Sequence, residues 1–168
     1  MSDTVLYDKQ DHIATITLNR PERHNALNRE AYDTAAEMFR RANAESDVRC
    51  IIFTGAGRSF CSGDDVAEIM AAGDGLAGSL GKTSSDSPTD SPTPSTTPAM
   101  VVEMRNARSP IIAAVNGAAV GFGMELTLVC DIRVASEAAR FSEMFIKRGI
   151  IATDISYDLL PGIVGPAM

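Results

Sequence analysis

The sequence predicts an α/β domain with parallel strand pairing. Three observations lead to this fold class. Runs typical of strands alternate along the chain with runs typical of helices. The stretch CIIFTG is a short apolar strand that ends at a glycine and precedes a helix. The length of 168 residues suits one domain and can bury a real core.

The N-terminal part predicts two strands and one helix. The stretch TVLYDKQDHIATITL gives two short strands joined by a polar turn at Lys9–Asp11, with Ala14 and Ile16 on one face. Asn28 has the side chain to cap a helix over Arg29–Ala44.

The middle of the chain predicts a strand at Cys50–Gly55, then an irregular turn, then a helix at Val66–Ala72. Residues 73–99 are rich in Ser, Thr, Pro and Gly and contain almost no large apolar residue. Such a segment buries too little surface to offset its ordering entropy. We expect a mobile loop here, within a single domain that spans residues 1–168.

The C-terminal part predicts a short helix near Met100–Ala107 and a buried strand at Pro110–Val115. A glycine turn then leads into a helix, and a further strand follows at Asp131–Ser136. The stretch ARFSEMFIKRGI continues into an ordered turn. Another helix is expected where the chain stops, at LLPGIVGPAM.

Composition excludes several classes of protein. The net charge of −7 argues against nucleic acid as a main partner, because such binding needs many contacts from Lys and Arg to phosphate. Cys50, Cys61 and Cys130 form no C-x-x-C pair and indicate reduced thiols in a cytoplasmic protein. The polar, acidic N-terminus is not a secretory signal, and no apolar run has membrane-spanning length.

One carboxylate stands in an apolar, glycine-rich segment. In VNGAAVGFGMELTLVCDI, Gly117, Gly121 and Gly123 precede Glu125. The spacing G-x-x-x-G-x-G does not match the dinucleotide or phosphate-binding fingerprints, and the chain lacks the nucleophile elbow G-x-S-x-G. Glycines at a strand-to-helix turn instead allow backbone N–H groups to face a cleft at the positive end of a helix. Such a turn can hold an oxyanion.

A second turn of this kind follows the strand at Cys50–Gly55, at Ser62–Asp65. Two converging N–H groups would polarise a thioester carbonyl and stabilise its enolate, with Glu125 as the proton-transfer group. The alternative is that the glycines only form turns and that Glu125 is a solvated residue favoured by the helix dipole.

Four stretches of the sequence resemble the crotonase superfamily, the enoyl-CoA hydratase/isomerase family. In chain order they are ITLNRPERHNAL (16–27), IIFTGAGRSFCSGDDV (51–66), SPIIAAVNGAAVGFGMELTLVCDIRVAS (109–136) and ARFSEMFIKRGI (139–150). The resemblance implies a repeated ββα spiral fold and an acyl-CoA thioester as substrate. It implies no metal and no separate cofactor, since coenzyme A is part of the substrate. It also implies a homotrimer or a dimer of trimers.

The resemblance further implies roles for individual residues. The backbone N–H groups of Asp64 and Phe122 would form an oxyanion hole, and Glu125 would be one of two catalytic glutamates. Burial would raise the pKa of Glu125, which suits proton exchange. The residues expected to line the substrate are Arg23, His24, Ala26, Leu27, Ser62, Asp64, Val66 and Gly121. Arg23 and His24 are candidates for phosphate contacts, with ordinary surface charges as the alternative.

The chain departs from the family pattern at the second glutamate. Phe145 occupies that position and cannot transfer a proton. Glu143 is one candidate replacement, because it would face the same way as Phe145 in an extended segment. Asp154, expected in the following loop, is the other. For both, a structural or solvated role is the alternative.

Two further departures concern the acyl pocket and the C-terminus. IIATDISYD (150–158) stands where relatives commonly carry a proline and a glycine pair, beside the acyl pocket. Family members usually continue for about another third of their length, with helices that cover the CoA site and build the trimer. Without them, apolar surface is expected to be exposed.

These observations favour an enoyl-CoA hydratase-like lyase. Isomerisation, thioester hydrolysis or decarboxylation on the same scaffold are alternatives, because one acid and an oxyanion hole suffice for some of these reactions. A non-catalytic CoA-ester-binding or assembly protein is the alternative from another class, because the second glutamate is replaced.

Overall fold

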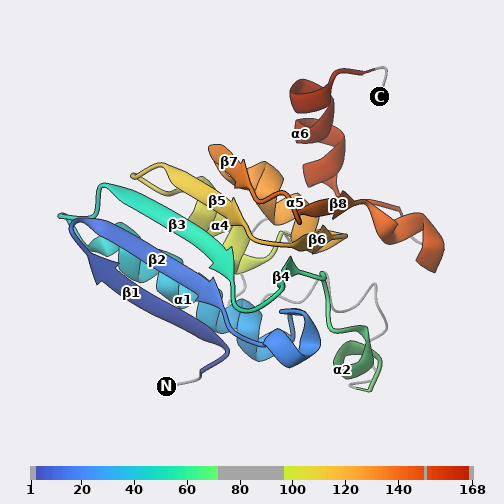
Figure 1. Cartoon of the computed structure of the whole chain (residues 1–168), viewed down its shortest axis with the longest axis horizontal. Helices are drawn as coiled ribbons and strands as arrows, with labels where there is room; N and C mark the ends of the chain where they lie inside the picture. The colour runs from blue at the N-terminus through green and yellow to red at the C-terminus, as the bar shows by residue number, and fades with distance from the viewer. Residues whose placement is uncertain (1–2, 72–96, 150, 167–168) are drawn as a thin grey trace, which may run out of the picture.

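Five strands form the main sheet of the structure, a computed structural model that describes residues 3–71, 97–149 and 151–166. They are β1 (Val5–Gln10), β2 (Ile13–Leu18), β3 (Cys50–Gly55), β5 (Ile111–Val115) and β7 (Ile132–Ala135). They lie in the order β1-β2-β3-β5-β7 (Figure 1). β1 and β2 are antiparallel, and every later pairing is parallel. The predicted α/β class is therefore confirmed.

The hairpin between β1 and β2 is tighter than predicted. Lys9 and Gln10 still belong to β1, so the predicted turn at Lys9–Asp11 is wrong. The turn consists of Asp11 and His12, with φ of 48° and 68°. Two consecutive residues with positive φ match the right-handed twist of the flanking strands.

A second, smaller sheet contains β4 (Ser59–Cys61), β6 (Ala118–Val120) and β8 (Arg140–Ser142), all parallel. We predicted turns at the first two of these strands. Each strand has three residues, which is too short for alternation to be recognised. This sheet matters for function because a glycine-containing turn follows both β4 and β6.

The helix α1 (Arg29–Ala44) has the predicted bounds. Asn28 Oδ1 accepts a hydrogen bond from the Ala31 N–H at 2.9 Å, so Asn28 is the cap that the sequence indicates. α4 (Ala99–Arg105) packs beside α1, and α1 packs on β1 and β2. The helices thus cover one face of the main sheet (Figure 1).

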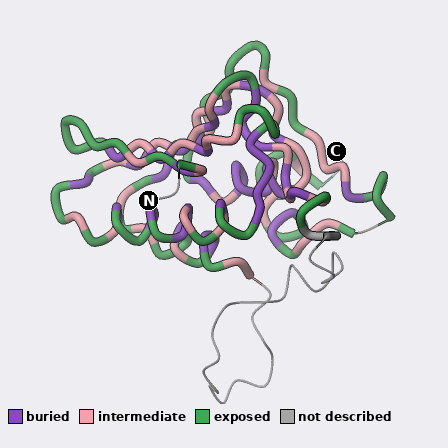
Figure 2. Tube along the Cα trace, turned by 90° about the horizontal axis from the view of Figure 1, so that it is seen from below, coloured by how far each residue is buried: buried purple, intermediate pink, exposed green. Residues whose placement is uncertain are grey.

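Three phenylalanines join the layers of the core. The ring centroid of Phe53 on β3 lies 5.3 Å from that of Phe39 on α1 and 5.4 Å from that of Phe60 on β4. All three side chains are fully buried, and both pairs meet edge to face, as aromatic rings prefer. The core therefore runs from α1 through the main sheet into the small sheet, with exposed residues around it (Figure 2).

The remaining helices lie around the small sheet. They are α2 (Val66–Ala71), α5 (Phe122–Val129), α6 (Asp154–Val164) and the 3-10 turns η1 (Pro21–Arg23) and η2 (Met144–Arg148). The helix expected at the C-terminal stretch already begins at Asp154. The predicted loop at 73–99 lies outside the described residues up to position 96, and Ala99 starts α4. Among the described helices, none is both long and apolar enough to cross a membrane.

Large apolar side chains are exposed mainly in the last third of the chain. β7 is an edge strand of the main sheet and β8 is an edge strand of the small one. The exposed residues in this region are Ile132, Val134, Phe141, Ile146, Ile151, Tyr157, Ile163 and Val164. The expected exposure of apolar surface is thus confirmed.

Candidate active site

The turn between β6 and α5 consists of one glycine. Gly121 has φ of 53° and ψ of −127°, a combination that glycine adopts far more readily than other residues. The Gly121 N–H donates to the Ser142 carbonyl of β8 at 2.8 Å. The helix can therefore start at Phe122, directly after the strand.

The turns after β4 and β6 touch through their backbones. Gly63, after β4, has φ of 87°, and a Cβ atom on it would lie 3.0 Å from the Val120 carbonyl oxygen and 3.3 Å from the Phe122 nitrogen. A Cβ on Gly123 would clash with the Cys61 carbonyl. The glycines are therefore required for this approach, which brings Asp64 and Phe122 into neighbouring turns.

Two backbone N–H groups at this junction have no partner in the described part of the chain. Neither the Asp64 N–H nor the Phe122 N–H donates a hydrogen bond there. By contrast, the Asp65 N–H donates to the Leu27 carbonyl at 2.9 Å. Phe122 is the first residue of α5, so its N–H lies at the positive end of the helix dipole. These two donors are suited to bind a negatively charged oxygen.

Glu125 lies in the first turn of α5 and is fully buried, with an exposed fraction of 0%. The alternative of a solvated residue is therefore wrong. Its Oε1 accepts hydrogen bonds from the Thr153 N–H at 3.0 Å and from the Ser156 hydroxyl at 2.8 Å, while Oε2 has no partner among the residues that the structure describes. Burial raises the pKa of Glu125, and the hydrogen bonds from Ser156 and Thr153 oppose that rise.

The Ser156 hydroxyl connects Glu125 with Glu143. Ser156 Oγ also lies 2.8 Å from Glu143 Oε1. A serine hydroxyl has one hydrogen and cannot donate to two carboxylates at once. The geometry is satisfied when one carboxyl is protonated and donates to Ser156, which then donates to the other. Burial raises the pKa of Glu143, and the Glu143 charge also raises the pKa of Glu125.

The structure separates the two candidates for the second acid. Glu143 lies beside Glu125, although the predicted extended segment is wrong, because η2 starts at Met144. Asp154 is exposed and is the first residue of α6, so its predicted place in a loop is also wrong. Phe145 is buried, and its ring lies 3.9 Å from where a Cβ of Gly121 would be. Phe145 therefore packs against the glycine turn.

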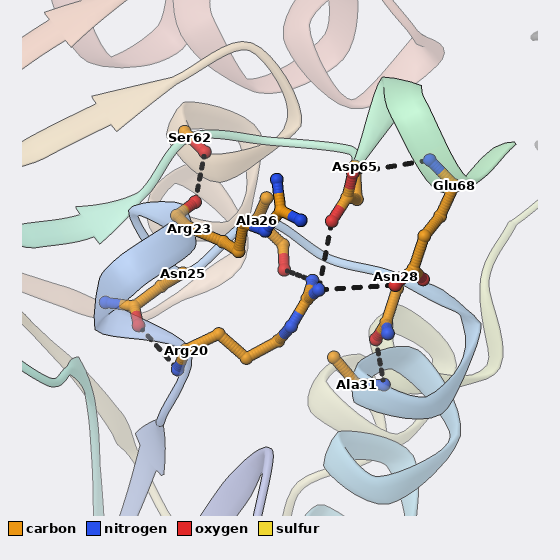
Figure 3. A network of polar contacts seen from close by, with 9 residues as sticks. All are labelled: Arg20, Arg23, Asn25, Ala26, Asn28, Ala31, Ser62, Asp65 and Glu68. Atoms are coloured by element: carbon orange, nitrogen blue, oxygen red, sulfur yellow. Dashed lines mark hydrogen bonds and ion pairs between the residues drawn. The ribbon is translucent and has the colours of Figure 1, made fainter. Parts of the chain in front are cut away.

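Arg20 holds the segment before α1 against the Ser62–Asp65 turn (Figure 3). Its guanidinium donates to the Ala26 carbonyl at 2.6 Å and to Asp65 Oδ2 at 3.0 Å. The Leu27 N–H donates to the Gly63 carbonyl at 2.8 Å. Of the predicted binding residues, Ala26 and Leu27 thus lie beside Asp64, which forms a bridge with Leu27.

The other predicted binding residues are spread around this junction. Ser62 and Val66 are half-buried, and the Ser62 hydroxyl lies 3.5 Å from the Arg23 carbonyl (Figure 3). Arg23 and His24 are exposed at the end of η1. His24 has contacts of its own, because Nδ1 lies 2.9 Å from Ser59 Oγ and Nε2 lies 3.2 Å from Arg58 Nη2.

Sequence reasoning missed three residues that hold the site together. Arg20, Tyr32 and Ser156 each contact residues more than 30 positions away in sequence. Arg20 lies in a stretch that resembles the family pattern, and Ser156 lies in the 150–158 stretch that departs from it, but neither position indicates a contact with the site. Tyr32 belongs to no local motif.

Known proteins share this arrangement of elements. A family model described as enoyl-CoA hydratase/isomerase matches residues 8–168. An enoyl-CoA hydratase from Alternaria alternata is 37% identical over 155 residues, which cover 92% of this chain and 48% of that protein. A 1,2-epoxyphenylacetyl-CoA isomerase from Escherichia coli is 34% identical over 167 residues, which cover 99% of this chain and 60% of that protein.

The solved structures agree with the sequence relatives. An enoyl-CoA hydratase/isomerase from Pseudoalteromonas atlantica superposes with a TM-score of 0.79 at 30% identity, over 98% of this chain and 59% of that one. Such neighbours place the chain in the fold that the resemblance implies. The chain spans 48% to 60% of the length of the three proteins compared.

Proposed function

Because the chain belongs to the enoyl-CoA hydratase/isomerase family, we propose that it adds water across the double bond of an enoyl-CoA thioester. One arrangement carries this proposal. Two backbone N–H groups that have no partner within residues 3–71, 97–149 and 151–166 lie on touching turns. The α5 helix that starts there carries a buried glutamate linked to a second one by a serine.

The N–H groups of Asp64 and Phe122 bind the thioester carbonyl oxygen. As water adds to the β-carbon, negative charge develops on this oxygen, and the two fixed donors stabilise it. Removing one such donor from an enzyme typically costs about 10²–10³ in kcat. Only the backbone acts here, so aspartate and phenylalanine are acceptable at these positions.

The two glutamates divide the proton transfers. Glu125 is the carboxylate, because its Oε1 accepts two hydrogen bonds, and hydrogen bonds to the charged form favour it. It takes a proton from water as the water oxygen bonds to the β-carbon. Glu143 is the protonated partner and gives its proton to the α-carbon. The proton then returns from Glu125 to Glu143 through the Ser156 hydroxyl, so no proton is gained or lost.

The coenzyme A part of the substrate lies along Ala26, Leu27 and the Ser62–Asp65 turn in this proposal. Arg23 and His24 are exposed at the edge of that segment, where cations can reach phosphate groups. Arg20 supports the proposal indirectly, because it fixes Ala26 against Asp65. A homotrimer or a dimer of trimers in the cytoplasm completes the proposal.

Isomerisation of an enoyl-CoA is the second candidate. A carboxyl pair that shares one proton can remove a proton from one carbon and return it to another without water. The Escherichia coli relative is named as an isomerase, which also supports this candidate. A 3-enoyl-CoA substrate distinguishes it from hydration.

The test is turnover of crotonyl-CoA by the purified chain, followed as loss of the enoyl absorbance. We expect Glu125→Gln and Glu143→Gln each to lower kcat about 100-fold or more, because each removes one proton-transfer group. Asp154→Asn is the matched control and should retain wild-type kcat, since Asp154 is exposed.

Three results would contradict parts of this proposal. Full activity of Glu143→Gln together with loss in Asp154→Asn would identify Asp154 as the second acid. Turnover of a 3-enoyl-CoA without hydration of crotonyl-CoA would favour isomerisation. Binding of crotonyl-CoA with no turnover of any thioester would favour the non-catalytic binding protein.

A further inference from the structure

Tyr32 contacts both residues that supply the unpartnered N–H groups. Its hydroxyl donates to Asp64 Oδ1 at 2.6 Å. Its ring centroid lies 5.7 Å from that of Phe122, with the planes tilted by 53°. One side chain of α1 therefore reaches the turn after β4 and the start of α5.

The Asp64 carboxyl needs this partner. Burial raises the pKa of Asp64, and the hydrogen bond from Tyr32 opposes that rise. In the described part of the chain, the Tyr32 hydroxyl is the only hydrogen-bond donor to this carboxyl. Without this donor, a half-buried carboxyl would turn toward another hydrogen-bond donor. The turn that carries Asp64 would then lose its hydrogen bond to α1.

The support behind Tyr32 is rigid. Tyr32 lies in the first turn of α1, which Asn28 caps, and Phe39 of the same helix packs on Phe53 of the main sheet. The turns themselves have no spare room, since Gly63 approaches the Phe122 nitrogen closely. A fixed helix thus holds one end of each contact.

We propose that Tyr32 is a positioning residue that sets the spacing between the Asp64 and Phe122 N–H groups. The hydroxyl fixes Asp64 and the ring fixes Phe122. This inference rests on the proposed function, in which those N–H groups bind the thioester carbonyl. A displacement of about 1 Å at a reacting group can cost about 100-fold in rate, so a partial loss of position has a measurable effect.

The first test is Tyr32→Phe, which keeps the ring and removes the hydroxyl. We expect kcat for crotonyl-CoA to fall about tenfold, less than the loss of a whole donor, with KM within about twofold of wild type. The absorbance of bound 2,4-hexadienoyl-CoA shifts to the red when its carbonyl is polarised, and we expect this shift to shrink. Tyr7→Phe is the control, because it also removes one tyrosine hydroxyl but does so on β1 and not at the turns after β4 and β6.

The second test asks whether Tyr32 acts through Asp64. Asp64→Ala keeps the backbone N–H and removes the carboxyl, and we expect the same loss of kcat as in Tyr32→Phe. In the double variant the two losses should not add, because they interrupt one contact. If Tyr32→Phe does not fold, Asp64→Ala alone decides, and wild-type kcat in a folded Asp64→Ala chain overturns the proposal.

The outcomes separate this inference from the proposed function. A wild-type red shift that Tyr32→Phe leaves unchanged, with unchanged kcat, overturns the role of Tyr32 and leaves hydration intact. Additive losses in the double variant also overturn it. A wild-type chain that binds 2,4-hexadienoyl-CoA without any red shift overturns the N–H pair and, with it, the role of Tyr32.

Discussion

Ser156 is the residue on which the protonation of the site depends. Its single hydroxyl hydrogen lies between one oxygen of Glu125 and one of Glu143, at 2.8 Å from each. Two ionised carboxylates would compete for that hydrogen and repel each other in a buried site. The pair therefore titrates as a unit, with apparent pKa values that belong to both groups.

Ser156→Ala should move the acid limb of the pH profile of kcat/KM to higher pH. The Ser156 hydroxyl donates to the ionised Glu125 and lowers the pKa of that group, so its removal raises the pKa of Glu125. Activity requires an ionised Glu125 on the acid limb, and this limb therefore moves upward. We also expect kcat near neutral pH to fall about tenfold, the value of one good hydrogen bond.

The control for this experiment is Ser109→Ala. The Ser109 hydroxyl donates to the Val48 carbonyl at 2.8 Å. Ser109 lies before the start of β5, whereas the turns that form the site follow the ends of β4 and β6. Its profile should match the wild type. An unshifted profile in Ser156→Ala would show that the serine does not connect the two glutamates.

At the residue scale, the sequence predicted what local patterns encode. Glu125 stood out because a charge in an apolar run is unusual, and the structure buries it completely. The neighbours that tune it come from elsewhere, since Ser156 is 31 positions away. Such contacts arise from tertiary packing and leave no periodic signal, so Ser156 and Tyr32 could not be predicted.

At the element scale, length decided what was predictable. α1 and β3 have the predicted bounds because each has a clear period or a clear end signal. The short strands β4 and β6 were mistaken for turns, since three residues carry no alternation. These two strands position the glycine turns that follow them, so the part of the fold nearest the site was the hardest to predict.

Gly63→Ala should separate the contact between the two turns from the cost of positive φ. A Cβ at Gly63 meets the Val120 carbonyl, while one at Gly149, with φ of 69°, meets nothing within 4 Å. We expect Gly149→Ala to lower the free energy of unfolding by about 1–2 kcal/mol. Gly63→Ala should cost about 1–3 kcal/mol more, because it overpacks backbone atoms.

Urea unfolding measures both free energies, and kcat measured beside them reports on the site. Gly63→Ala should lose activity, whereas Gly149→Ala should retain it. Equal effects of the two substitutions on unfolding would mean that the turns after β4 and β6 adjust without strain.

At the scale of the whole molecule, the apolar surface of the last third is the dominant feature. Val134 is 60% exposed on an edge strand and Ile146 is 85% exposed on η2. Exposed edge strands and apolar patches promote association. The alternation of strand and helix patterns predicted the fold class, while the trimer or dimer of trimers stays a prediction, since a single chain does not reveal its partners.

We expect the chain of 168 residues to associate with increasing concentration, as measured by sedimentation velocity. The double substitution Val134→Lys and Ile146→Glu should weaken association about tenfold or more by placing charges on the patch. Val102→Lys, on the exposed face of α4, is the control and should leave it unchanged. If the wild type, the double variant and Val102→Lys associate equally, the contact between chains lies elsewhere on the surface.

The N–H groups of Asp64 and Phe122 belong to the main chain, and this has a genetic consequence. Nineteen of the twenty amino acids carry the same donor, and proline alone lacks it. A single codon change can erase this half of the site only by introducing proline, whereas many codon changes erase Glu125. A survey of mutations that looks for side chains whose loss abolishes activity would therefore find the acid, whereas at the anion-binding pair it would record only the partial loss expected for Asp64→Ala.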